Sequence, residues 1–185
     1  MRRVFIDTSV LFPFSVMDLL LALTEDGVHQ VLWTDELLDE WERVIVREHH
    51  RTEETAASVT TAIREFFADS RIGRERYAHL IAQMPGDDPD DRPHMAAAVA
   101  AQVDALVTVN LRDFPAGPLG ERGVRVVEPD TYLVELFDEQ PDEVVATIVR
   151  IAGEKSRPPM TPLGVLAALR GAGLARFPER IAPRL

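Results

Sequence analysis

The sequence has no cysteine, a single lysine (Lys155) and no long apolar run. Without cysteine the chain can form neither a disulfide nor a thiolate metal site, so oxygen or imidazole must hold any metal. No stretch reaches the roughly 18 apolar residues of a membrane span, and the first residues lack the apolar segment of a signal peptide. These absences predict a protein of the cytoplasm that makes no membrane contact.

Positive charge is also scarce. The net charge is −11. Acidic and basic residues balance in residues 131–185, so the whole excess of acid lies in residues 1–130. A simple nucleic-acid-binding module usually carries a basic surface, and this composition argues against one. It does not argue against an enzyme that meets phosphate groups through bound cations.

Several catalytic motifs are missing. The segment GPLGERG lacks the lysine and the spacing of a phosphate-binding P-loop. The five histidines, His49 among them, form no HxxxH or HExxH pair, so we assign none of them to a metal. Ser9 has no evident base beside it that would make it a nucleophile.

What is present is an alternation of short apolar strands with amphipathic helices. This alternation predicts an α/β/α sandwich of three layers with a mainly parallel sheet over residues 1–130. Beyond residue 130 the pattern is helical only, which predicts a helical C-terminal extension over 131–185. Strands are expected at 4–6, 29–33, 104–110 and 124–129; helices at 15–27, 36–49, 52–70, 74–84 and 94–103; and a loop at 111–123.

Acidic residues follow the predicted strands or begin the helices next to them. Asp7 ends the first strand, Asp113 lies in the loop after the third, and Asp90 and Asp91 begin the alanine-rich helix. Glu40 lies beside the apolar stripe of the helix after the second strand. Ligand sites of parallel sheets form at the carboxyl ends of strands, and clustered carboxylates suit Mg²⁺ or Mn²⁺.

Each of these acids also has a structural interpretation. Asp7 could cap the following turn, Asp90 and Asp91 could be a polar loop and a helix cap, and Asp113 could be a turn residue before Pro115. Glu40 could be a boundary residue of its helix. The ordered set of acids points to function more strongly than any member does alone.

The residues quoted as VFIDTSVL, LLDEWERV and DPDDRPHMAAAVAAQVDALVTVNLRDFP resemble the PIN-domain family, most closely its VapC-type toxin ribonucleases. The resemblance covers about residues 3–128 and implies a metal site of four carboxylates, from Asp7, Glu40, Asp91 and Asp113, that catalyses RNA hydrolysis with Mg²⁺ or Mn²⁺. Many relatives carry an acid where this chain has Asn110, so Asn110 is expected to be a neutral ligand or hydrogen-bond partner. Further expected pocket residues are Thr8, Ser9 and Asp90, the last as the rival of Asp91.

The function that this resemblance implies is a metal-dependent endoribonuclease, the toxin of a type II toxin–antitoxin system. Its implied partners are RNA, a cognate antitoxin and a second copy of the chain, with Arg92 and Arg112 as residues that could hold the RNA backbone. An alternative is a PIN-like scaffold that binds RNA or protein without cleaving it. A phosphohydrolase with Asp7 as nucleophile is disfavoured because position nine holds Ser9 where that chemistry needs an acid.

Overall fold

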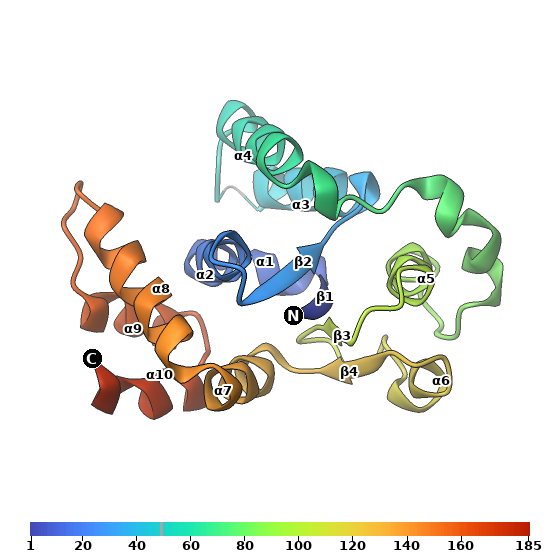
Figure 1. Ribbon diagram of the computed structural model, residues 1–185. Coiled ribbons are helices and arrows are strands. Elements are labelled where there is room, and N and C mark those ends of the chain that lie inside the picture. Colours follow the sequence, from blue (N-terminus) through green and yellow to red (C-terminus); the bar gives the residue numbers. More distant parts are fainter. Residues whose placement is uncertain (49) are drawn as a thin grey trace.

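The computed structural model describes residues 1–48 and 50–185, and within them the sheet has four parallel strands in the order β2-β1-β3-β4 (Figure 1). β1 (Arg2–Ile6) lies between β2 (His29–Leu32) and β3 (Ala105–Val107), and β3 pairs with β4 (Arg125–Val127). The apolar side chains of β1 and β3 are buried, as continuous apolar runs predict for inner strands of a parallel sheet.

Helices cover both faces of the sheet and produce the predicted three layers. α1 (Thr8–Leu11) and α2 (Phe14–Glu25) lie on one side of the sheet, whereas α5 (Arg92–Ala100) lies on the other (Figure 1). α3 (Asp35–Arg47) packs against α1 and α4 (Glu53–Phe66).

Threonine caps fix where two of these helices begin. The Thr34 hydroxyl accepts a hydrogen bond from the backbone of Leu37, and the Thr52 hydroxyl accepts one from Thr55. The predicted end of α3 at His49 lies outside the described residues. Gly27, just after α2, has φ +70°, a conformation that glycine adopts without strain and that ends the helix as expected.

Two predicted elements are wrong. Residues 74–84 form not an α-helix but two 3₁₀ segments, Arg74–Arg76 and Ala78–Gln83, because the ring of Tyr77 between them is fully buried and its hydroxyl bonds to Glu36 on α3. The predicted loop 111–123 contains a short helix, α6 (Ala116–Gly120), whose Leu119 is fully buried and holds that helix against the body.

The C-terminal extension packs tightly on the body. The extension consists of α7 (Pro129–Glu139), which follows β4, and of α8 (Pro141–Glu154), α9 (Pro162–Gly171) and α10 (Arg176–Ile181), and α8 and α9 contact α2 directly (Figure 1). Thr147 on α8 donates a hydrogen bond of 2.6 Å to Asp26 after α2. α7 begins just before the predicted boundary at residue 130, and the division of the chain there stays a prediction.

A buried histidine joins the sheet to the extension. His29 on β2 is fully buried, with its Nε2 2.8 Å from the carbonyl of Leu20 and its Nδ1 2.7 Å from the hydroxyl of Tyr132 on α7. A carbonyl can only accept, so Nε2 carries the proton and Nδ1 accepts from Tyr132. Both partners are therefore satisfied by neutral imidazole.

The helices in the described ranges are all too short or too polar to cross a membrane.

Candidate active site

Asp7 ends the central strand at its carboxyl edge. Its backbone N–H donates to the carbonyl of Val107 on β3 at 2.9 Å. Its side chain is 5% exposed, and Oδ2 accepts hydrogen bonds from Thr108 Oγ1 at 2.8 Å and from Ser9 Oγ. The carboxylate does not cap α1, and two neutral hydroxyls offset only part of the cost of burying a charge. No cationic side chain of the described residues lies within 4 Å of it.

Two threonines line the same edge of the sheet. Thr8, which the sequence placed in the pocket, is 2% exposed, and its hydroxyl makes no hydrogen bond among the residues described. Thr108 was not predicted, although its place directly after β3, beside Asp7 on the neighbouring strand, was a usable signal. This edge of the sheet thus offers the buried carboxylate of Asp7 and the buried hydroxyl of Thr8, and within the described residues that hydroxyl has no hydrogen-bond partner.

Asp91 precedes the first residue of α5, and its side chain caps no backbone N–H group there. Burial is the largest cause that raises its pKa, repulsion from the carboxylates of Asp7, Asp88 and Asp113 adds to it, and His94 opposes it, so that the pKa lies at about 6. Acids from three separate segments therefore act on one another. Asp90, the rival assignment, is exposed, and its backbone N–H donates to Asp88 in the loop.

Asp113 and Asn110 form one small loop after β3. The Asn110 side chain donates a hydrogen bond to Asp113 Oδ2, and the backbone of Asn110 donates to Thr108 Oγ1 at 2.9 Å. The chain Asn110–Thr108–Asp7 therefore links this loop to the end of β1. The side chain of Asn110 is a neutral amide and adds no negative charge to this loop. Asp113 lies near enough to Asp91 to raise the pKa of Asp91.

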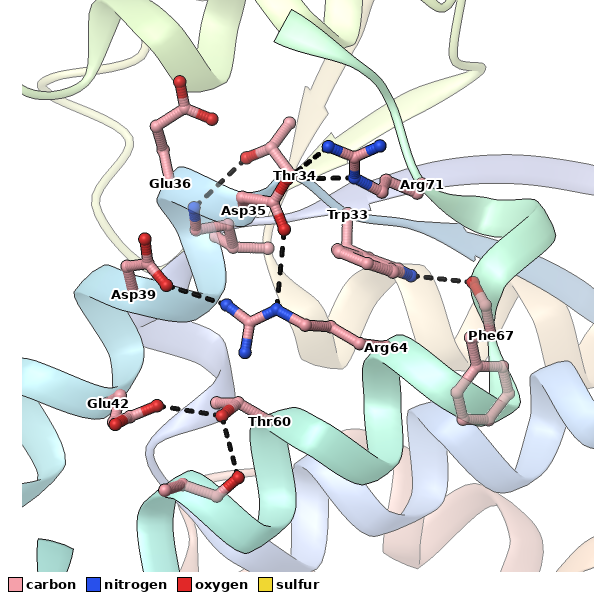
Figure 2. A network of polar contacts seen from close by, with 12 residues as sticks. Trp33, Thr34, Asp35, Glu36, Asp39, Glu42, Thr60, Arg64, Phe67 and Arg71 are labelled. Carbon is pink, nitrogen blue, oxygen red and sulfur yellow. Dashed lines mark hydrogen bonds and ion pairs between the residues drawn. The ribbon is translucent and has the colours of Figure 1, made fainter.

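α3 carries five acids, and partners on neighbouring elements bind four of them. Figure 2 shows three of these contacts: Asp35 accepts from Arg64 and Arg71, Asp39 accepts from Arg64, and Glu42 accepts from Thr60. The fourth, Glu36, accepts from Arg74 and from the Tyr77 hydroxyl. These contacts tie α3 to α4 and to the 3₁₀ segments.

Glu40 is the remaining acid of α3, and its partner is His94. Glu40 Oε2 lies 2.7 Å from His94 Nε2, and the histidine is 2% exposed. Burial works to raise the pKa of Glu40, but the hydrogen bond and charge of His94 outweigh it, so this pKa lies below its usual value. Thr8 and Arg43 lower it further, although the Thr8 hydroxyl lacks hydrogen-bond geometry.

His94 is a site residue that the sequence analysis missed. Burial lowers its pKa, but Glu40, Asp7 and Asp91 together outweigh that effect and raise it above the usual value. Its Nδ1 is buried and makes no hydrogen bond within the described part of the chain. Its position in the first turn of α5, three residues after Asp91, was the available signal.

Three of these residues line one cleft. Glu40, Asp91 and His94 border a hollow of about 660 Å³ between α3 and the start of α5, together with Glu36, Asp88 and Asp90. Asp7 and Asp113 do not line this hollow but lie close enough to raise the pKa of Asp91. The structure therefore gathers the four predicted carboxylates into one region.

This region suits a divalent cation in its chemistry. Across residues 1–48 and 50–185, no three His, Asp or Glu side chains lie close enough together to chelate one ion in the conformation shown. Mg²⁺ keeps several waters and takes only one or two protein carboxylates directly, so it does not require such a triad. Mutually repelling carboxylates and an unpartnered hydroxyl fit a hard cation with oxygen ligands.

The two predicted RNA-binding arginines differ in how their guanidinium groups are placed. Arg92 is half-buried and donates to the carbonyl of Gly86 at 3.0 Å, which turns it toward the preceding loop. Arg112 is exposed, between Asn110 and Asp113 in the chain. Contact of either residue with RNA stays a prediction.

Known proteins resemble the chain in two segments. Residues 3–112 match the PIN domain, and residues 129–183 match the VapC50 C-terminal domain. A protein of Mycobacterium tuberculosis named "Putative ribonuclease VapC50" is 33% identical over 93 residues, which are 50% of this chain and 54% of that protein, so the match spans about half of either length. No solved structure matches significantly. The PIN match covers more than half of the residues, and the chain therefore belongs to the PIN-domain family, with a VapC50-type C-terminal domain after the PIN domain.

Proposed function

We propose that the protein is a metal-dependent endoribonuclease that acts as the toxin of a toxin–antitoxin pair. The observation that carries this proposal is the gathering of Asp7, Asp91 and Asp113 near the carboxyl edge of the sheet, where burial and, in addition, repulsion from the other carboxylates raise the pKa of Asp91. A nearby cation would relieve that repulsion. The PIN family and a relative whose name describes a ribonuclease support the same reading.

The proposed ligands of Mg²⁺ or Mn²⁺ are Asp7, Glu40, Asp91 and Asp113. The bound ion would activate a water molecule and stabilise negative charge on the scissile phosphate. Thr108 and Ser9 hold the Asp7 carboxylate in place, and His94 holds one oxygen of Glu40 and leaves the other available. The chain itself thus positions the carboxylates.

The experiment that tests this function measures cleavage of a mixed RNA pool by the purified protein. We expect cleavage with Mg²⁺ or Mn²⁺, none with EDTA, and a return of cleavage when the metal is restored. Asp7→Asn should not cleave at any metal concentration. Binding of metal and RNA without cleavage by the wild-type protein would favour the scaffold alternative. Cleavage that survives EDTA would show that the metal mechanism is wrong.

The proposed function also implies binding partners for the protein. We propose that RNA is the substrate, that a cognate antitoxin restrains the enzyme, and that two copies of the chain form a dimer in the cytoplasm. The phosphohydrolase alternative finds no support at Asp7, because Ser9 uses its hydroxyl to donate to that carboxylate and offers no acid.

His94 should act as a positioning residue for Glu40. His94→Phe removes the donor to Glu40, so we expect Mg²⁺ affinity, measured by calorimetry, to fall by about 10–100-fold, as when a partner of a metal ligand is removed. His94→Gln keeps an amide donor and should restore part of that affinity. Unchanged circular dichroism would show that the variants fold. Equal Mg²⁺ affinity in His94→Phe and the wild type would contradict this role.

A further inference from the structure

Two arginines of α3 border the acidic cleft at the end away from the first turn of that helix. Arg43 and Arg47 lie three and seven residues after Glu40, and this spacing places all three on one face of the helix. Both arginines line the same hollow as Glu40, Asp91 and His94. Along the α3 side of the cleft, Glu36 and Glu40 therefore lie toward the start of the helix, and the two arginines lie toward its end.

The positive charge of Arg43 is available in this position. Its Nε donates to the backbone carbonyl of Asp39 at 3.3 Å, whereas the Asp39 carboxylate is bound by Arg64. Within the described ranges no carboxylate lies within 4 Å of the Arg43 guanidinium. Partners on other elements hold Asp35, Asp39 and Glu42 of α3 (Figure 2).

Arg47 makes one weak ion pair. It pairs with its neighbour Glu48 at 3.1 Å, and the two side chains are 71% and 53% exposed. An ion pair this exposed contributes little to stability, so a phosphate could replace it at small cost. Other exposed arginines of the chain also lack strong partners. What distinguishes Arg43 and Arg47 is that they line the cleft that holds Glu40 and Asp91.

We propose that Arg43 and Arg47 bind successive phosphates of the RNA strand next to the cleavage position, so that the strand leaves the acidic cluster along α3 toward its C-terminal end. This inference rests on the proposed nuclease function. A rise of 1.5 Å per residue puts Arg43 about 4.5 Å and Arg47 about 10.5 Å along the helix axis from Glu40. The planar guanidinium fork suits phosphate oxygens. In a chain of net charge −11, local positive charge of this kind is what would guide a polyanion to an acidic site.

The test is binding of a fluorescent single-stranded RNA in Mg²⁺ over a series of salt concentrations. Asp91→Asn serves as the non-cleaving parent, to which Arg43→Gln, Arg47→Gln or both are added. We expect each change to weaken binding about tenfold, as for the loss of a charged hydrogen bond. The slope of log affinity against log salt should become shallower by about 0.7 for each phosphate that the variant no longer neutralises. Arg170→Gln, on the remote helix α9, makes the same charge change and should alter neither quantity.

A second measurement separates failure of this inference from failure of the proposed function. In the otherwise wild-type enzyme, Arg43→Gln with Arg47→Gln should raise KM for RNA by a larger factor than it lowers kcat. If the wild type cleaves RNA while the double variant matches Arg170→Gln in affinity and salt slope, the inference is wrong and the nuclease function stands. If neither the parent nor the wild type binds RNA, both are wrong.

Discussion

Replacing Asp91 by asparagine should abolish RNA cleavage and at the same time make the metal-free protein more stable. We expect cleavage to fall by about 10³-fold, because the metal loses a carboxylate and with it about 4 kcal/mol of transition-state stabilisation. Repulsion from Asp7, Asp88 and Asp113 opposes the charged form of Asp91, and a neutral amide removes it. Because Asp91 is partly exposed, the gain in unfolding free energy should be about 1 kcal/mol, which corresponds to about 2–4 °C in Tm for a chain of this size.

Thermal unfolding with and without Mg²⁺ measures the change in stability, and the RNA cleavage assay measures the loss of activity. Mg²⁺ should raise the Tm of the wild type, because it binds only the folded state, and should raise that of Asp91→Asn much less. Loss of a helix cap does not confound the comparison, because the Asp91 side chain makes no capping hydrogen bond. Asp87→Asn is the matched control, because Asp87 is exposed in the same loop and does not line the cleft, and it should change neither cleavage nor Tm. A metal-free Asp91→Asn protein that unfolds at a lower temperature than the wild type would contradict the repulsion.

Acid should destabilise the fold through His29. Burial lowers the pKa of His29 from 6.5 to about 4, with a smaller opposing effect from the Leu20 carbonyl. The unfolded chain therefore binds a proton between these two values that the folded chain does not. The contribution of neutral His29 is complete above about pH 6.5 and is lost as the pH falls toward 4. The loss should be about 2 kcal/mol at pH 5.

Urea unfolding at pH 5 and pH 7.5 tests this expectation. His29→Gln can keep both hydrogen bonds but does not titrate, so its unfolding free energy should change by about 2 kcal/mol less than that of the wild type between these pH values. The other titrating groups are common to both proteins and cancel in the difference. His79→Gln, at an exposed position, should behave as the wild type does. Equal pH dependence in the wild type and His29→Gln would show that His29 does not titrate in this way.

The strands and most helices could be predicted because their signals are local. The apolar run of β1 is buried as expected, and the Thr34 hydroxyl caps α3 from within the sequence next to that helix. The 3₁₀ segments around Tyr77 could not be predicted, because a distant partner, Glu36, holds the ring in the core. α6 was missed because its glycines and proline are typical of loops, and the packing of Leu119 overrides them.

The site shows the same division between local and distant information. Asp7, Glu40, Asp91 and Asp113 could be proposed because each follows a strand or occupies a recognisable helix position. The hydrogen-bond partners of these acids could not be predicted, because Thr108 is 101 residues from Asp7 and His94 is 54 residues from Glu40 in the sequence. Which acids of α3 are held by arginines elsewhere also depends on packing (Figure 2).

The central place of β1 in the sheet has a consequence for synthesis of the protein. β1 is made first, but its partner β3 follows about 100 residues later, so their pairing must close a long loop, and such non-local pairing slows folding. Asp7 cannot meet Thr108 until β3 has left the ribosome. A growing chain therefore cannot bring Asp7, Glu40, Asp91 and Asp113 together early. Their arrangement forms only when translation of the domain is nearly complete.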